Sequence, residues 1–225
     1  MVMAATQHLE VLYEDEFCIV INKPAGLAVQ GGKGISISLD NMLAQKWSQR
    51  PFPVHRLDRD TSGILLVAKT KEAAAHFSRL LAGSKKQYIA ICAGRPANAD
   101  GIISSDLSVH GSVKKCETRY RLLNTFRGEE EFSLLELELC TGRMHQIRRH
   151  LAMTGNPILG DDKYGNFDLN HKLRKTMKLK RLLLHASRLV IPETPGGGSL
   201  DLSAPLPEHF RRFMDLLAPS TPIPI

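Results

Sequence analysis

The sequence predicts an α+β fold, in which many short strands are combined with only a few helices. Leu135, Leu137 and Leu139 alternate with glutamates, which is the pattern of a half-buried strand. Between residues 73 and 81, by contrast, apolar residues recur at helical spacing. The chain has 225 residues, of which 43% are hydrophobic and 24% charged, so it can form one substantial globular domain with its own core.

Several segments have the composition and length of strands and are bounded by turn residues. They lie at residues 9–13, 18–21, 64–68, 87–93, 133–140, 182–184 and 189–191. The first two are separated by a turn at 14–16, and the second ends at the breaker Lys23-Pro24-Ala25-Gly26. A surface turn is expected at 195–198.

Three helices are predicted. Thr70 can cap the first, and Gly83 stands where a C-cap glycine belongs. The second follows Gly142 and runs to residue 152. The third has Pro207 at its first position, and its inward-facing residues are Phe210, Phe213 and Leu217.

The composition narrows the function classes. No apolar run is long enough to cross a membrane, and the N-terminus lacks the features of a signal peptide, so we expect a cytoplasmic protein. The four cysteines form no CxxC pair and are expected to be reduced thiols. A formal charge of +7 favours polyanionic partners such as nucleic acid, although charge alone is a weak signal.

The run HRLDRDTSG (55–63) places two carboxylates, two arginines and a histidine within nine residues. Such a cluster does not build a hydrophobic core, and between a proline-rich segment and a buried strand it fits an active-site loop. An arginine–carboxylate turn with a Thr-Ser-Gly cap is an equally simple interpretation of these residues alone.

Arg148 lies on the helix that follows Gly142. At a spacing of four residues, Met144, Arg148 and Ala152 share one face, with Ile147 and Leu151 beside them. A charge on an apolar face is costly unless it is paired, so we expect a carboxylate partner for Arg148. That pair could be purely structural. His145 and His150 are five residues apart, a spacing that does not favour a metal site.

The chain also resembles a known protein family. Motifs that run in family order through about residues 9–207 are NKPAG (22–26), HRLDRDTSG (55–63) with AKT (68–70), KKQYIAICAG (85–94), CETRY (116–120), TGRMHQIRRHLA (141–152), GNPILGDDKYG (155–165) and RLLLHA (181–186). They are similar to those of the RluA-type family of RNA pseudouridine synthases. Within it, DDKYG, RLLLHA and a GGKG loop (31–34) are nearest to the branch that acts on large-subunit (23S) ribosomal RNA.

The resemblance implies a mixed, mostly antiparallel bent sheet around a central active-site cleft, and an isomerase that converts uridine to pseudouridine. It assigns the catalytic nucleophile to Asp58, not Asp60, and the other catalytic positions to Tyr88 and Arg148. Tyr88 could stack on the flipped base or act as a general base, or be an ordinary strand tyrosine. Arg148 would favour the ionised form of Asp58, which a nucleophile requires.

The implied isomerisation needs no cofactor and no metal, and RNA is the expected partner. The residues expected to contact RNA are Lys23, Arg56, Arg59, Arg143, His145 and Lys163. Arg56 would also fill the gap that the flipped nucleotide leaves.

We expect residues 1–225 to be one catalytic domain without the N-terminal S4 domain of many relatives, acting as a monomer. Ribosomal RNA is the favoured substrate, with transfer RNA as the alternative. A non-catalytic RNA-binding or ribosome-assembly module is a second hypothesis. A glycosidase built on Asp58 and Asp60 is a third and weaker one, because two loop residues so close in sequence rarely flank one bond.

Overall fold

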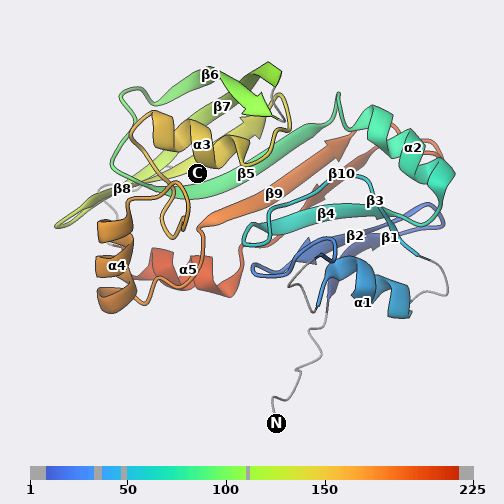
Figure 1. The fold of residues 1–225 in the computed structure, drawn as a ribbon, viewed down its shortest axis with the longest axis horizontal. Coiled ribbons are helices and arrows are strands. Elements are labelled where there is room, and N and C mark those ends of the chain that lie inside the picture. Colours follow the sequence, from blue (N-terminus) through green and yellow to red (C-terminus); the bar gives the residue numbers. More distant parts are fainter. Residues whose placement is uncertain (1–8, 33–36, 47–49, 110–111, 218–225) are drawn as a thin grey trace, which may run out of the picture.

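A computed structural model describes residues 9–32, 37–46, 50–109 and 112–217, and the strands within these ranges form one sheet (Figure 1). The strands are β1 (Glu10–Glu14), β2 (Cys18–Lys23), β3 (Phe52–Pro53), β4 (Ser62–Ala68), β5 (Lys85–Ala93), β6 (Asp100–Val109), β7 (Ser112–Arg127), β8 (Glu131–Leu139), β9 (Leu184–Ile191) and β10 (Leu200–Ser203). The helices are α1 (Leu39–Lys46), α2 (Lys71–Leu80), α3 (Gln146–Met153), α4 (Phe167–Thr176) and α5 (Glu208–Asp215).

The sheet is mixed and mostly antiparallel, as predicted. Its main path runs β1-β2-β4-β9-β5-β8-β7-β6, while β3 pairs with β4 and β10 with β9. All of these pairs are antiparallel except β4 with β9, which is parallel. Part of the glycine-rich loop at 31–34 lies outside the described residues.

The centre of the sheet is buried on both faces. In β2, Ile19 and Ile21 join a core cluster that includes α1, whereas Cys18 and Val20 join the cluster beneath α2. Alternate residues of β4 divide between the same two clusters. Because both faces are covered, these strands are continuous apolar runs rather than alternating ones. This explains why both were predictable from sequence.

The parallel contact between β4 and β9 is short and lies where both strands begin. It joins Ser62 to His185 and Gly63 to Ala186. The Ser62 hydroxyl and His185 Nδ1 are 2.9 Å apart, and His185 Nε2 lies 3.3 Å from the Ala204 carbonyl. That carbonyl can only accept, so Nε2 carries the proton and Nδ1 accepts from Ser62. The loops entering β4 and β9 are thereby held side by side.

All three predicted helices are present, with small differences at their ends. Thr70 caps α2 by accepting from the Ala73 N–H at 3.1 Å, as predicted. Gly83 is not its C-cap: Leu81 occupies that position in a right-handed conformation. Pro207 is the N-cap of α5 rather than its first residue, and the predicted inward residues of this helix are buried. None of the helices among the described residues is long and apolar enough to cross a membrane.

Two predicted strands are one, and several elements were not predicted. Residues 184–191 form the single strand β9, because Ser187 and Arg188 interrupt the hydrophobic pattern but not the backbone pairing. The β6–β7 hairpin lacks a strong pattern, since among the β7 side chains that the structure describes, those with no exposed surface are Cys116 and Thr118 rather than large aliphatic ones. The other elements missed are α1, α4, β3 and β10.

Candidate active site

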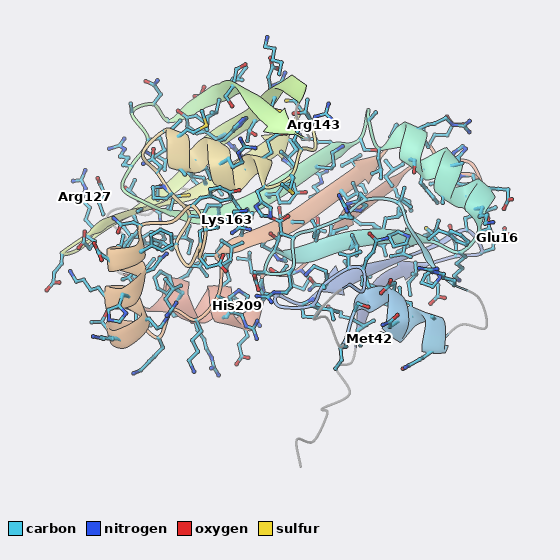
Figure 2. The ribbon with its side chains drawn as sticks, viewed as in Figure 1. Glu16, Met42, Arg127, Arg143, Lys163 and His209 are labelled. Carbon is cyan, nitrogen blue, oxygen red and sulfur yellow. The ribbon has the colours of Figure 1, made fainter. Side chains whose placement is uncertain are left out.

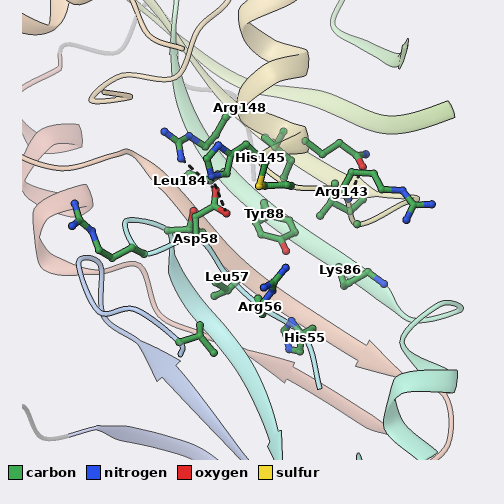
Figure 3. Close-up of a pocket in the computed structure, with 18 of the residues that line it drawn as sticks. His55, Arg56, Leu57, Asp58, Lys86, Tyr88, Arg143, His145, Arg148 and Leu184 are labelled. Carbon is green, nitrogen blue, oxygen red and sulfur yellow. Dashed lines mark hydrogen bonds and ion pairs between the residues drawn. The ribbon is translucent and has the colours of Figure 1, made fainter. Parts of the chain in front are cut away.

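A cavity of about 790 Å³ opens where the loop before β4, the middle of the sheet and the start of α3 meet (Figure 3). The lining residues used below are Arg56, Asp58, Tyr88, Arg143, His145 and Arg148. All three positions predicted to be catalytic are therefore in one cavity, although they are 30 or more residues apart in the chain. Asp60 is not among the lining residues, and its carboxylate faces Arg59 at 3.4 Å.

Asp58 is held in a loop that is anchored from the neighbouring NKPAG segment. The Gly26 N–H donates to the Arg59 carbonyl at 2.8 Å, and the Lys23 ammonium donates to the same carbonyl at 3.0 Å. The Asp58 side chain is 27% exposed, so its carboxylate is accessible from the cavity. Asp58 and Asp60 are two residues apart in the same motif, but Asp58 lines the cavity whereas Asp60 faces Arg59.

Arg148 has the carboxylate partner that its place on an apolar helix face predicts. Its Nη1 lies 3.4 Å from Asp58 Oδ2 (Figure 3). The stronger partner is Asp161, which accepts from Nε at 2.8 Å and from Nη2 at 2.7 Å, and Asp162 accepts from Nη2 at 3.1 Å. Burial opposes the charge of Arg148, but hydrogen bonds and the charge of Asp161 outweigh it and raise its pKa.

The contact between Arg148 and Asp161 also shifts the pKa of Asp161. Burial acts to raise the pKa of Asp161, and hydrogen bonds from Arg148 and from the backbone N–H groups of Tyr164 and Lys163 overcome this and lower it. The guanidinium is thus fixed on one edge by Asp161, while Nη1 is presented to Asp58. The prediction that Met144 shares a helix face with Arg148 is wrong. Met144 precedes α3 and is 57% exposed.

The turn before α3 is fastened by Gln146. Its side-chain oxygen accepts from the Thr141 hydroxyl at 2.8 Å and from the Arg143 N–H at 3.1 Å. Its amide nitrogen donates to the Glu117 carbonyl of β7 at 2.9 Å. These bonds fix the turn on the sheet, and the residue between the turn and the helix, His145, has a left-handed conformation with φ 54°. Non-glycine residues seldom adopt it, and such positions concentrate at functional sites.

His145 lies between Asp58 and a tyrosine that sequence reasoning did not single out. Its Nε2 is 3.7 Å from Asp58 Oδ1, and its Nδ1 is 3.1 Å from the Tyr164 hydroxyl. Burial lowers the pKa of His145, with Arg148 and Lys163 acting in the same direction and Asp58 against it. The imidazole is therefore neutral at pH 7, so its contact with Asp58 is not an ion pair. Asp161 and Tyr164 come from GDDKYG, a motif quoted only for its resemblance.

Tyr88 is on β5 and is only 7% exposed. Its ring lies beside Asp58 and its hydroxyl points toward Arg56 (Figure 3). Burial raises the pKa of Tyr88, and the charge of Asp58 adds to the shift. The phenol is therefore protonated at neutral pH in the free protein, which suits stacking or hydrogen-bond donation better than immediate proton abstraction.

Lys23 does not face RNA, and the prediction that it contacts phosphate is wrong. Its side chain has no exposed surface, and its ammonium donates to the carbonyls of Pro24, Leu27 and Arg59 at 2.9–3.0 Å. Burial lowers its pKa to about 7. Lys23 thereby joins the NKPAG turn to the loop that carries Asp58.

Of the remaining predicted RNA contacts, Arg56, Arg59, Arg143 and His145 line the cavity, whereas Lys163 does not. Arg56, Arg59, Arg143 and Lys163 are exposed. Arg143 lies beyond one end of α3 and Lys163 below the helix (Figure 2). His55 instead accepts from the Leu66 N–H at 3.0 Å, and burial lowers its pKa to about 4, so it is a neutral structural residue.

This geometry can be compared with known proteins. Residues 17–153 match the family model described as RNA pseudouridylate synthase. Ribosomal large subunit pseudouridine synthase C of Rickettsia prowazekii is 37% identical over 90% of this chain and 69% of its own length. The protein of the same name from Salmonella typhi is 35% identical over 92% of this chain and 69% of its own length.

Solved structures agree with the sequence comparison. Human RNA Pseudouridylate Synthase Domain Containing 4 has a TM-score of 0.77 and 25% identity, covering 95% of both chains. Human RNA Pseudouridylate Synthase Domain Containing 1 has the same fold, with a TM-score of 0.79 and 24% identity over 100% of this chain and 94% of that one. With the matched segment spanning the cavity loop and α3, the chain belongs to the RNA pseudouridylate synthase family and is an isomerase that converts uridine to pseudouridine in RNA.

Proposed function

We propose that this enzyme modifies uridines of large-subunit ribosomal RNA, with Asp58 as its nucleophile. The substrate proposal is supported by the names of its relatives, each a ribosomal large subunit pseudouridine synthase. The proposal for Asp58 is carried by one observation: its carboxylate is in the cavity, 3.4 Å from the Arg148 guanidinium and beside the buried Tyr88. We further propose that the protein acts as a monomer in the cytoplasm and that its catalytic residues belong to a single domain.

The proposed reaction begins with a uridine that leaves its base stack and enters the cavity, at a cost of roughly a few kcal/mol. Arg56, which is exposed at the cavity, would occupy the space that the nucleotide leaves. The uracil would lie against the Tyr88 ring. Exposed Arg59, Arg143 and Lys163 would bind the flanking phosphates, and neutral His145 would donate or accept a hydrogen bond at the sugar or base.

Asp58 would then attack the ribose while the N1–C1′ bond breaks and its electron pair stays on the uracil. The detached base turns, and C5 forms the new bond to C1′ as the Asp58–C1′ bond breaks and frees the carboxylate. The proton on C5 is then lost as a proton is gained at N1. No atoms are added or removed, so the mass is unchanged. Arg148 contributes by holding the Asp58 carboxylate in place, because Asp161 already fixes the other edge of the guanidinium.

The test is to map pseudouridines in ribosomal and transfer RNA from cells with and without the gene, then to restore wild-type protein, Asp58→Asn or Asp60→Asn. We expect specific large-subunit positions to lose pseudouridine and to regain it with wild type and Asp60→Asn only. A loss confined to transfer RNA would contradict the ribosomal substrate. Full restoration of pseudouridine by Asp58→Asn would contradict the proposed nucleophile.

A further inference from the structure

Eight residues at the end of α4 and in the loop that follows it carry five positive charges and no negative one. We call residues 174–181 the basic segment; its charged residues, all exposed, are Arg174, Lys175, Lys178, Lys180 and Arg181. Within the described part of the chain, no carboxylate forms an ion pair with any of these five side chains. Lys172, just before the segment, is by contrast paired with Glu129 at 3.2 Å and Glu130 at 3.0 Å. The charge of the basic segment is therefore uncompensated.

One end of the basic segment touches the NKPAG turn, which in turn holds the loop that carries Asp58. The Arg181 guanidinium donates to the Ala25 carbonyl at 2.9 Å. It lies directly against Gly26, where an added Cβ would come within 2.6 Å of Nη1. The Gly26 N–H in turn donates to the carbonyl of Arg59, the residue after Asp58. Arg181 is thus joined to the Asp58 loop through one residue.

The backbone of Arg181 also meets the other side of the catalytic site. Gly160 packs so closely on it that an added Cβ would come within 2.2 Å of the Arg181 carbonyl oxygen. The next residue, Asp161, holds Arg148. From this point the basic segment leads away to α4, at one end of the molecule in Figure 1. A chain advances at most about 3.6 Å per residue, so Arg174 is within about 25 Å of Arg181.

Lys178 has a backbone conformation that does not suit lysine. It follows the C-cap Met177 and has φ 56°, in the left-handed region. The Leu179 N–H donates back to the Leu173 carbonyl at 3.3 Å, which closes the chain around this position. Glycine is the usual residue after a helix C-cap because it adopts this conformation without strain. Among the residues that the structure describes, the Lys178 ammonium has one hydrogen-bond partner, the Lys175 carbonyl at 3.5 Å, so its contacts there do not explain the lysine.

We propose that the basic segment binds the sugar–phosphate backbone of the RNA that flanks the target uridine and guides that strand to the cavity. This proposal rests on the proposed function. The segment supplies uncompensated charge, is joined through Arg181 to the loop that carries the exposed Arg59, and has an exposed lysine at a left-handed position that suits glycine. Each phosphate it neutralises releases counterions, which makes the contact favourable and dependent on salt.

The test is the affinity of the full chain for a protein-free transcript of large-subunit ribosomal RNA, measured over a range of KCl concentrations. The variant is Lys175→Gln/Lys178→Gly, in which glycine suits the left-handed position, so the melting temperature should not fall. We expect affinity to drop on the order of tenfold at fixed salt, and the slope of log K against log salt to become shallower by about 1.5. Turnover at saturating RNA should be unchanged, since neither residue lies in the cavity.

The matched control is Lys71→Gln/Arg79→Gln on α2, which removes two exposed charges at the opposite end of the molecule in Figure 1. This variant should bind RNA nearly as wild type does. Equal losses in the two double variants would overturn the proposal, because general charge would then explain them. So would unchanged RNA affinity with lost binding to phosphatidylserine vesicles, which would assign the segment to a membrane surface.

The proposed substrate and the proposed role of the basic segment can be contradicted by different results. If the wild type binds the transcript but forms no pseudouridine in it, and deletion of the gene leaves ribosomal RNA unchanged, the proposed substrate is wrong. The comparison of the two double variants still decides whether the basic segment binds RNA.

Discussion

At the residue scale, the central feature is a guanidinium shared by three carboxylates. Arg148 binds Asp161 with two hydrogen bonds and meets Asp162 and Asp58 through one each. Asp161 is almost fully buried, with 1% of its side chain exposed, whereas Asp162 is 72% exposed. Because exposed ion pairs contribute little, Asp161 sets the position of the guanidinium, and only the contact with Asp58 belongs to the cavity.

Asp161→Asn should therefore impair both stability and turnover. The change leaves a buried arginine without its main compensating charge, which costs about 3 kcal/mol in proteins. The value of kcat should fall more than the affinity for RNA, since the loss acts on the orientation of Arg148 toward Asp58. Chemical denaturation and single-turnover kinetics would measure the two effects.

The matched control is Asp162→Asn, which removes a contact to the same guanidinium from the exposed side. It should change the free energy of unfolding by less than about 1 kcal/mol and leave kcat unchanged. If both variants behave alike, Asp161 does not have the positioning role assigned to it.

Part of this site could be predicted from the sequence. The charge of Arg148 on an apolar helix face was enough to predict a carboxylate partner, and that prediction is confirmed. Its main partner could not be chosen, because Asp161 sits in a polar loop 13 residues further on. Lys23 was misjudged because a lone lysine beside a proline resembles a surface residue. A signal was present, since Lys23 follows directly on the apolar run 18–21 and is the last residue of the buried strand β2.

At the scale of elements, the short parallel contact of β4 with β9 positions the catalytic loop. Gly63 has φ 110°, and an added Cβ would come within 2.1 Å of the Ala186 carbonyl oxygen. The backbones of the two strands approach closely only because this residue has no side chain.

Gly63→Ala should destabilise the protein by more than about 3 kcal/mol, because both the conformation and the space exclude a Cβ. The comparison is Gly128→Ala in the β7–β8 turn, where φ is not positive and the nearest atom to an added Cβ is 3.9 Å away. Urea denaturation of both variants would measure the difference. A Gly63→Ala protein as stable as Gly128→Ala would contradict the close approach described here.

His185, at the contact between β4 and β9, makes the stability of the protein depend on pH. Burial lowers the pKa of His185 from 6.5 to about 4. Between these values the unfolded chain binds a proton that the folded protein excludes, so stability is complete above pH 6.5 and falls as the pH approaches 4. The contribution is about 1.4 kcal/mol per pH unit.

Unfolding free energies measured between pH 7 and pH 4 should therefore fall less steeply in His185→Gln than in the wild type. The exposed His171→Gln serves as control and should keep the wild-type slope. Parallel slopes for wild type and His185→Gln would show that the imidazole is not excluded from protonation by the fold.

The elements themselves were predictable to different degrees. Strands β2, β4 and β8 have strong hydrophobic patterns, and the Thr70 cap identifies the start of α2. The division of β9 into two strands was wrong because its central residues are polar and are satisfied by partners such as Ser62 and Asp201. Such partners come from distant segments and cannot be found by local periodicity. The β6–β7 hairpin was missed for a related reason, because its buried residues include the small Cys116 and Thr118 and show no clear alternation.

At the scale of the whole molecule, a single sheet brings together a loop, a strand and a helix that are far apart in sequence. The α+β class and the mixed, mostly antiparallel sheet followed from the strand patterns and the family resemblance. The order of the strands did not, because it depends on crossovers such as that between β4 and β9. The outcome is a cavity at the centre, with Asp58, Tyr88 and Arg148 on three different elements around it.

The most direct test of this arrangement uses large-subunit ribosomal RNA transcribed with uridine that carries tritium at C5. Forming the C5–C1′ bond displaces that hydrogen, so isomerisation releases tritium to water. Purified wild-type protein and Asp60→Asn should release it at specific sites, whereas Asp58→Asn should bind the RNA and release none. Tritium release by Asp58→Asn at the wild-type rate would contradict the central claim that Asp58 is the nucleophile.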